Sequence, residues 1–305
     1  MTALRLKLVR ALRLFKHVPF ISNSHIAQST YNQVKEVTIK SFPDQEQIVE
    51  TPHGFKMELN LSNPYERAIA TGTYKNDAVS HFQDLASEGD TVIDVGANIG
   101  YYTLMAASEV GRHGEVYSFE PIDDNFSRLE RNASINGFDN TNLFNYGLSK
   151  DAGKQEMYLP KGRPEEATLN EETWSELTHN KTEQKSTQVV KLENFDNSEV
   201  RAAIGDISLV KIDVEGAEFD VLQSMEQTLK ENNTPILVTV HIPQLQKMGV
   251  PVKKFINYLS DLNYDTVDSL TTGMTKPIED LKSNVDSIAE PQDFLFVTKE
   301  EGGIS

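Results

Sequence analysis

The chain of 305 residues contains no cysteine. Disulfides, thiolate metal ligands and cysteine nucleophiles are therefore excluded from its chemistry. The absence is compatible with a cytoplasmic protein, and a cytoplasmic location is our prediction. No uninterrupted apolar run is long enough to span a bilayer. Charged residues also interrupt the apolar residues near the N-terminus, which disfavours a cleaved signal peptide.

Basic residues are in the minority. The chain has 29 Lys and Arg against 46 Asp and Glu, a formal net charge of -17. A generally acidic surface disfavours non-specific binding to nucleic acid, so we expect no nucleic-acid partner. The apolar share of 38% and the charged share of 25% are ordinary for a globular domain.

Residues 1–22 depart from this acidic balance, because they contain basic residues and no acid. As a helix they would place Leu4, Leu8, Leu12 and Phe15 on one face. Such a helix packs on its own domain or on a partner subunit, or it lies at a membrane surface as a peripheral contact. The sequence leaves both interpretations open and does not indicate an oligomeric state. The basic residues are Arg5, Lys7, Arg10, Arg13 and Lys16.

The order of patterns predicts three parts. Residues 1–63 form an N-terminal extension, in which the basic helix is followed by a β-hairpin at 36–61 with its turn at Pro52-His53-Gly54. Asn63-Pro64 is typical of a helix start, so the main domain is predicted to span 64–299. Residues 300–305 form a polar tail.

Strands and helices alternate from residue 90 onward, which predicts a parallel sheet covered by helices on both faces. The predicted strands are 91–95, 115–119, 141–146, 207–212, 236–241, 264–267 and 293–297. The predicted helices are 101–109, 123–136, 217–230 and 251–262. Residues 151–205 interrupt this alternation with short strands near 157–159 and 188–190. The polar stretch 161–186 between them is typical of a functional or a mobile loop.

The turn after the first strand is rich in small residues. Gly96 and Gly100 give G-x-x-x-G, and Asn98 stands where a dinucleotide fingerprint needs its second glycine. Asp94 places a carboxylate just before the turn, which repels phosphates and favours an ammonium or a sulfonium. No Gly-Lys-Ser/Thr follows, so a P-loop is excluded.

Glu120 ends the next strand, about twenty residues beyond the glycine turn. An acid in this place can accept both ribose hydroxyl protons. The pocket therefore suits a ribose, no phosphate and a positively charged amino-acid part, which are the features of S-adenosylmethionine. The predicted cofactor-binding residues are Asp94, Gly96, Ala97, Asn98, Gly100, Thr103, Glu120 and Pro121.

Two motifs carry a family resemblance. Residues 94–103 and 211–218 (Lys-Ile-Asp-Val-Glu-Gly-Ala-Glu) resemble the FkbM family of S-adenosylmethionine-dependent methyltransferases, and 117–121 and 132–137 also fit. The resemblance covers about residues 64–298. It implies an α/β fold of the class I methyltransferase type (Rossmann-like), with a seven-stranded, mostly parallel sheet whose last strand is antiparallel. It also implies O-methylation of sugars, glycolipids or polyketide-type products.

The chain departs from the family pattern at two places, both on the acceptor side. It has Leu192-Glu193 where the family often has Leu-Asp, and Thr239 and Val240 where an acid often precedes the strand end. The acceptor is therefore predicted only by class, as a glycan, a glycolipid or another small hydroxylated metabolite.

Methyl transfer to a hydroxyl needs aligned reactants and a group that accepts the hydroxyl proton. Asp213, Glu215 and His241 follow two strands of the predicted sheet and are our candidate catalytic bases. Asp213 and Glu215 could instead only cap the following helix. A divalent cation held by these three residues is chemically conceivable, but no ligand spacing requires it, so we predict no metal.

Two other functions stay open at this point. One is an NAD or nucleotide-sugar enzyme on a related sheet, which the missing second glycine and Asp94 disfavour. The other is a catalytically inactive scaffold with the same fold, which the intact turn and Glu120 disfavour.

Overall fold

The computed structural model describes residues 44–161, 163–177, 186–270, 274–284 and 291–298, together with Lys7. The predicted helix in residues 1–22 (apart from Lys7), the first part of the predicted hairpin and the polar tail lie outside these ranges. Within the described ranges, no helix is long and apolar enough to cross a membrane.

The described residues form two compact units. The first contains the residues before Asp77 together with Ser134–Asn136, and the second contains the rest. The predicted domain boundary after residue 63 stays a prediction, since the compact units divide after Asn76.

The first unit contains a hairpin and a helix. Strands β1 (Glu46–Glu50) and β2 (Lys56–Asn60) pair antiparallel, as predicted for this part of the hairpin. Helix α4 (Pro64–Thr71) begins where the sequence predicts. The side chain of Asn63 accepts a hydrogen bond from the backbone N–H of Tyr65 at 2.8 Å, which satisfies a donor at the helix start.

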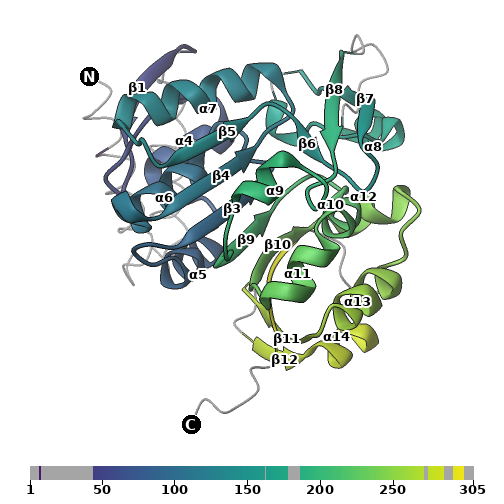
Figure 1. The fold of residues 1–305 in the computed structure, drawn as a ribbon. Coiled ribbons are helices and arrows are strands. Elements are labelled where there is room, and N and C mark those ends of the chain that lie inside the picture. The colour runs from purple at the N-terminus through teal and green to yellow at the C-terminus, as the bar shows by residue number, and fades with distance from the viewer. Residues whose placement is uncertain are drawn as a thin grey trace, which may run out of the picture. The chain divides into compact units, whose positions relative to one another are not determined.

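The second unit is built on a mostly parallel sheet flanked by helices, as predicted (Figure 1). Its strands, in sheet order, are β12 (Met274–Pro277), β11 (Tyr264–Ser269), β13 (Gln292–Thr298), β10 (Ile236–Val240), β9 (Leu209–Ile212), β3 (Thr91–Val95), β4 (Glu115–Phe119) and β5 (Thr141–Phe144). The five strands from β10 to β5 are parallel. Strand β13 is antiparallel to both of its neighbours, as the family resemblance implies.

The described sheet has eight strands, whereas the resemblance implies seven. The additional strand is β12, which pairs antiparallel with β11 at the edge of the sheet. The other seven include every strand that the sequence predicts for this sheet, with ends shifted by up to two residues.

The helices of this unit confirm most of the predicted pattern. They are α5 (Asn76–Leu85), α6 (Tyr101–Glu109), α7 (Asp123–Asn136), α9 (Glu199–Ala203), α10 (Glu218–Ser224), α11 (Glu226–Asn232), α12 (Ile242–Lys247), α13 (Val252–Asp261) and α14 (Ile278–Asn284), with a short 3-10 turn η1 (Gly111–His113). Helix α12 is not among the predicted helices, although its start contains Pro243, a residue that fits the first turn of a helix.

The predicted helix at 217–230 is two helices, α10 and α11, separated at Met225. Asp196 causes the separation: its carboxylate accepts hydrogen bonds from the backbone N–H groups of Gln227 at 2.7 Å and Thr228 at 3.1 Å. This acid caps the start of α11 from a distant part of the chain. A local sequence pattern does not contain such a cap.

The interruption at 151–205 forms a separate three-stranded sheet, ordered β6 (Gly147–Leu148), β8 (Thr187–Glu193) and β7 (Gly153–Tyr158). Its described residues also include a 3-10 turn, η2 (Pro164–Glu166), and helix α8 (Glu171–Leu177). The two predicted short strands are confirmed and are longer than expected. This small sheet is called the insertion sheet below.

The register of the main sheet aligns the ends of its central strands. Val95 of β3 lies opposite Phe119 of β4 and Ile212 of β9. The residues that follow these strands therefore meet at one edge of the sheet, where open α/β sheets bind ligands. The strands themselves are buried almost throughout, because helices flank the sheet.

Candidate active site

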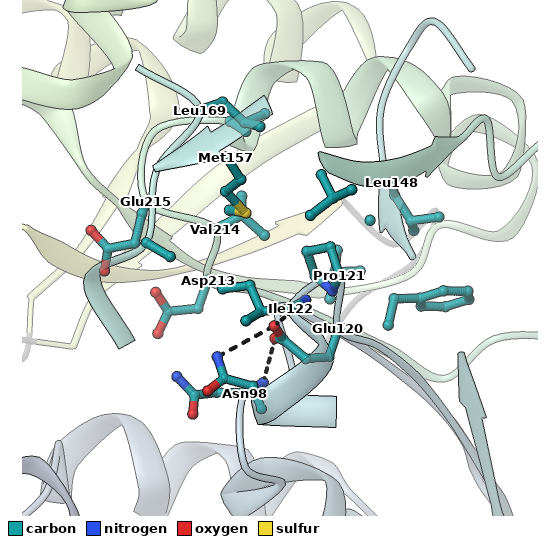
Figure 2. A pocket seen from close by; sticks show the side chains of 18 of the residues that line it. Asn98, Glu120, Pro121, Ile122, Leu148, Met157, Leu169, Asp213, Val214 and Glu215 are labelled. Atoms are coloured by element: carbon teal, nitrogen blue, oxygen red, sulfur yellow. Dashed lines mark hydrogen bonds between the residues drawn. The ribbon is translucent and has the colours of Figure 1, made fainter. Parts of the chain in front are cut away.

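A cavity lies at the carboxyl ends of β3, β4 and β9. It measures about 630 Å³, including the space open to solvent at its mouth, which is in the range of small-molecule sites. Figure 2 shows Glu120, Pro121 and Ile122 on one part of its wall, and Asp213 and Glu215 beside one another on another part. Met157, Leu169 and Val190 contribute an apolar wall, and all three belong to residues 151–205, which are called the insertion below.

The glycine turn requires its first glycine for two reasons. Gly96 has a φ of +77°, and a Cβ at this position would lie 2.0 Å from the backbone oxygen of Asp213. The backbone N–H groups of Gly96 and Ala97 both donate to the carbonyl oxygen of Phe119, at 3.0 and 3.1 Å. Gly96 therefore allows the turn after β3 to pass close to the loop after β9.

Asn98 completes the turn in a left-handed conformation, with a φ of +51°. Its side-chain oxygen accepts a hydrogen bond from the N–H of Ile99 at 2.7 Å, which helps an asparagine to hold this conformation. Asn98 lines the cavity, whereas Gly100 packs at the start of α6 against Leu129.

Glu120 is a buried acid held by neutral donors. Its carboxylate accepts hydrogen bonds from the backbone N–H of Asn98 at 2.8 Å and of Ile122 at 3.0 Å, and from the side-chain amide of Asn125 at 3.4 Å. Burial raises the pKa of Glu120 to about 7, although these hydrogen bonds act in the opposite direction. The side chain is thus oriented into the cavity wall by groups that carry no charge.

Asp94 is also buried, but it does not line the cavity. The hydroxyl of Thr103 donates to its carboxylate at 2.7 Å, and the ammonium of Lys211 lies 3.3 Å from its other oxygen. Lys211 also donates to the carbonyl oxygen of Gly96 at 3.4 Å and lies over the ring of Tyr102. Asp94 and Thr103 therefore support the glycine turn from below the cavity.

Of the eight predicted cofactor-binding residues, the cavity is lined by Gly96, Asn98, Glu120 and Pro121. The remaining residues, Asp94, Ala97, Gly100 and Thr103, lie behind this wall.

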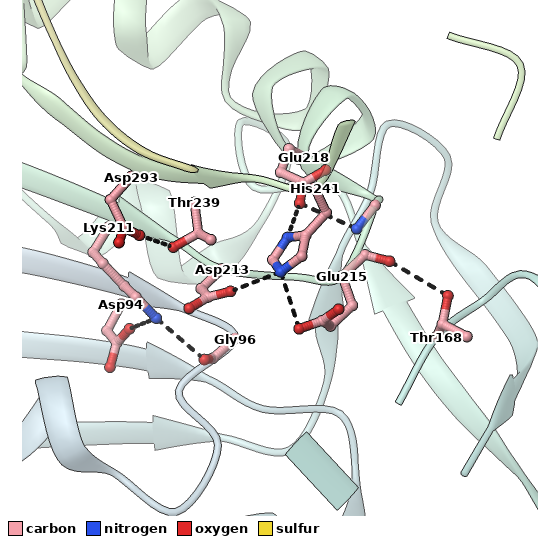
Figure 3. Close-up of polar contacts among 11 residues, drawn as sticks. Asp94, Gly96, Thr168, Lys211, Asp213, Glu215, Glu218, Thr239, His241 and Asp293 are labelled. Carbon is pink, nitrogen blue, oxygen red and sulfur yellow. Dashed lines mark hydrogen bonds and ion pairs between the residues drawn. The ribbon is translucent and has the colours of Figure 1, made fainter. Parts of the chain in front are cut away.

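The three candidate bases come together as predicted from their strands. Figure 3 shows His241 between Glu218 on one side and Asp213 and Glu215 on the other. Nε2 of His241 lies 3.0 Å from Oε1 of Glu215 and 3.8 Å from Oδ1 of Asp213. Asp213 and Glu215 line the cavity, whereas the buried His241 lies behind them. The side chains of Asp213, Glu215, Glu218 and His241 are called the acidic cluster below.

The carboxylates decide the charge of His241. Burial alone would lower the pKa of its imidazole, but Glu215 and Glu218 more than offset this effect and raise the pKa well above its ordinary value. The acidic cluster of the free protein therefore contains a protonated imidazole among carboxylates.

Two residues of this arrangement were missed from the sequence. The position of Glu218 near a helix start is typical of a structural helix residue, yet it is fully buried and its Oε1 lies 2.8 Å from Nδ1 of His241. Lys211 appears in the sequence only as the first residue of the motif at 211–218. A lysine inside the apolar strand Leu209–Ile212 is a signal that could have been used, because a buried lysine requires a partner.

The insertion contacts the acidic cluster directly. The hydroxyl of Thr168 donates to the backbone oxygen of Glu215 at 3.3 Å. The side-chain amide of Asn170 donates to the backbone oxygen of Lys247 at 3.3 Å, and Lys247 forms an ion pair with Glu176 of α8. The polar stretch after β7 thus lies next to the strand ends that carry the candidate bases.

A parallel sheet with a glycine turn after one central strand, an acid after its neighbour and an antiparallel last strand defines a class I methyltransferase. The chain matches the methyltransferase FkbM domain over residues 94–266, more than half of its length. It therefore belongs to the FkbM methyltransferase family, and it is an S-adenosylmethionine-dependent methyltransferase. Family membership decides against the NAD and nucleotide-sugar alternatives.

Curated relatives are distant. The chain is 27% identical over 192 residues to the hexuronic acid methyltransferase AglP of Haloferax volcanii, which covers 63% of this chain and 70% of that protein. It is 24% identical over 177 residues to Methyltransferase 1 of Beauveria bassiana, covering 54% of this chain and 71% of that protein. A solved FkbM methyltransferase from Methylobacillus flagellatus aligns with a TM-score of 0.42 and 11% identity, over 76% of this chain and 52% of that one.

Proposed function

We propose that the protein transfers the methyl group of S-adenosylmethionine to a hydroxyl of a glycan, a glycolipid or a related small polyhydroxylated molecule. The observation that carries this proposal is the position of Asp213 and Glu215. Their carboxylates line the same cavity as the glycine turn and Glu120. One cavity thus offers both a cofactor cradle and acceptors for a hydroxyl proton.

The cofactor's place in the cavity follows from its chemistry. Glu120 would accept hydrogen bonds from its ribose hydroxyls, and Gly96 and Asn98 would hold its amino-acid part at the turn. The charge of Asp94 is balanced by Lys211, so Asp94 fixes the turn instead of binding the cofactor. Asp213 lines the same cavity, and its negative charge would attract the positively charged sulfonium.

The transfer is an in-line displacement. The acceptor oxygen forms a bond to the methyl carbon while the carbon–sulfur bond breaks, and its electron pair returns to sulfur. The hydroxyl proton passes to the carboxylate of Asp213 or Glu215. The products are a methyl ether and S-adenosylhomocysteine. His241 lies behind both acids and positions them, so the predicted base function is carried by the carboxylates.

The acidic cluster favours a hydroxyl over a carboxylate as the acceptor. A carboxylate nucleophile would enter beside Asp213 and Glu215, and like charges at this distance repel. A sugar hydroxyl donates a hydrogen bond to the same groups. The relative AglP is a hexuronic acid methyltransferase by name, which supports a sugar acceptor without fixing the methylated group.

The test separates ether from ester products. The full chain is incubated with methyl-labelled S-adenosylmethionine and either a neutral hexoside, a hexuronic acid glycoside or the glycan fraction of its source cells. We expect label in a product that is stable to mild alkali, as a methyl ether is. Label that mild alkali releases as methanol would show a carboxyl ester and would overturn the proposal.

A second measurement assigns the proton acceptor. Asp213→Asn and Glu215→Gln keep the size of each side chain and remove its basicity. Loss of a general base lowers kcat by about 10²–10⁴, while calorimetry with S-adenosylhomocysteine should show retained binding. Glu226→Gln, an exposed acid on α11, is the matched control. Unchanged turnover in both site variants would contradict the assignment. Retained binding with no acceptor methylated in any fraction would favour the inactive scaffold.

A further inference from the structure

The acidic cluster contains a set of donors from two adjacent strands. Asp213 and Glu215 follow β9, and His241 follows β10. One ligand atom from each of the three lies within 4.8 Å of the others. From the sequence we predict no metal, because no ligand spacing requires one. The pairing of β9 with β10 is what brings these residues together.

The distances suit an ion at the centre of the three donors. Two ligand atoms bound at right angles to an ion, each at about 2.1 Å, lie about 3 Å apart, and opposite ligands lie about 4 Å apart. The separations here are 3.0 Å from His241 to Glu215 and 3.8 Å from His241 to Asp213. The remaining pair of ligand atoms, on Asp213 and Glu215, lies within 4.8 Å, so a movement of these carboxylates would bring all three donors to one ion.

Glu218 holds the imidazole in the orientation that a ligand needs. It is completely buried, and its Oε1 lies 2.8 Å from Nδ1 of His241. It also accepts a hydrogen bond from the N–H of Gly216 at 3.1 Å, which fixes its own position. A carboxylate on one ring nitrogen leaves the other directed at Asp213 and Glu215 (Figure 3). Ligating histidines typically have such a partner.

The backbone of Glu215 also directs its side chain toward the cluster. Glu215 has a φ of +52°, a conformation that is uncommon for residues with a side chain. The neighbouring Thr168 anchors its carbonyl oxygen from the insertion at 3.3 Å. Thr168 therefore holds the backbone of Glu215, and the imidazole of His241 lies 3.0 Å from its carboxylate.

We propose that Asp213, Glu215 and Nε2 of His241 bind one divalent cation, with Glu218 as the residue that positions the imidazole. Two carboxylates with one imidazole form a mixed oxygen and nitrogen set, which suits Mn²⁺ and, with waters completing the shell, Mg²⁺. Asp213 and Glu215 line the cavity, so the ion has a path of entry.

The cation's part in catalysis rests on the proposed function, whereas its binding rests on the cluster alone. A cation at this position would attract the acceptor oxygen and lower the pKa of its hydroxyl. The oxygen of Asp213 or Glu215 that does not bind the ion, although a weak base, would then suffice to accept the proton. Two ligand carboxylates balance its charge, and Glu218 adds another negative charge. The site would still disfavour an anionic acceptor.

Binding of Mn²⁺ to the full chain tests this site. Mn²⁺ is added to the chelator-treated protein, and free ion is followed by electron paramagnetic resonance. We expect about one bound Mn²⁺ per chain, and a loss of affinity of at least about tenfold in Asp213→Asn and in Glu215→Gln. Spin-echo modulation from an imidazole nitrogen should be present in the wild type and absent in His241→Gln. Glu226→Gln is the matched control and should bind Mn²⁺ as the wild type does.

The outcomes separate the two proposals. Calorimetry with S-adenosylhomocysteine on the same samples shows whether each variant is folded. No bound Mn²⁺, equal affinity in both carboxylate variants, or nitrogen modulation that persists in His241→Gln would overturn the metal site. A protein that methylates its acceptor equally after chelation would overturn the cation's catalytic part. A protein that binds Mn²⁺ as expected but forms no methyl ether would instead contradict the proposed function.

Discussion

The two ends of the cavity use buried acids in opposite ways. At the end beside the glycine turn, which is the proposed cofactor end, Glu120 is surrounded by N–H donors that carry no charge. At the proposed acceptor end, the three carboxylates of the acidic cluster surround the imidazole of His241. The acidic groups of the cluster therefore outnumber its one basic group. Neutral donors orient a carboxylate, but its protonation state still depends on pH. A charged partner fixes the charge as well as the position.

Asp94 shows that the nature of the partner decides the role of an acid. It is the last residue but one of β3, beside the strand that precedes Glu120, and it is also buried, but its partner is the ammonium of Lys211. This pair lies below the glycine turn and stabilises it. Of the two buried acids at neighbouring strand ends, only Glu120 lines the cavity.

The largest expected effect comes from breaking the Asp94–Lys211 pair. Lys211→Met leaves a buried carboxylate without its cation, which destabilises a protein by about 3–5 kcal/mol. For a domain of this size that lowers the thermal midpoint by about 10 °C. Circular dichroism on heating measures the shift.

The double variant with Asp94→Asn should recover most of the lost stability. Lys230→Met, which removes only an exposed ion pair with Glu226, is the control. A thermal midpoint of Lys211→Met within about 2–3 °C of wild type, roughly the shift of the control, would contradict this prediction. It would show that burial of the Asp94 carboxylate does not require the charge of Lys211.

A smaller effect is expected from Gly96→Ala. The left-handed conformation alone costs about 1–2 kcal/mol for alanine, and the contact of the new Cβ with the backbone of Asp213 adds to it. Stability should fall by at least about 2 kcal/mol, and affinity for S-adenosylhomocysteine should fall with it. Gly153→Ala, where a Cβ meets nothing within 4 Å, is the matched control and should change little. Equal stability of the two variants would contradict the close approach of the two loops.

The smallest effect concerns pH at the cofactor end. The pKa of Glu120 is raised to about 7, so the carboxylate is ionised above this pH and protonated below it. In the proposed binding mode, only the ionised form would accept hydrogen bonds from both ribose hydroxyls. Affinity for S-adenosylhomocysteine should therefore rise by about tenfold, or about 1.4 kcal/mol, between pH 6 and pH 8. Calorimetry at the two pH values measures it, and Glu120→Gln should bind more weakly and without this dependence. A pH dependence that persists in Glu120→Gln would assign it to another group.

The sequence locates the glycine turn and Glu120 more directly than the acidic cluster, for a physical reason. The turn at 96–100 and Glu120 belong to one strand–helix–strand segment, so their spacing along the chain defines their positions. The acidic cluster depends on which strands are neighbours, on the anchoring of Glu215 by Thr168, and on a buried Glu218. The division of α10 from α11 by Asp196 has the same origin. Each of these contacts joins residues that are distant along the chain, and amphipathic periodicity carries no information about them.

The left-handed backbone of Glu215 has a consequence for engineering. A glycine at this position would adopt the same φ without strain, so selection for thermal stability alone would favour losing the glutamate. The glutamate instead keeps a carboxylate at the cavity wall, where we propose that it takes part in methyl transfer, so stability would be lost in exchange for activity. Directed evolution that scores only heat resistance should therefore drift away from activity at this position first.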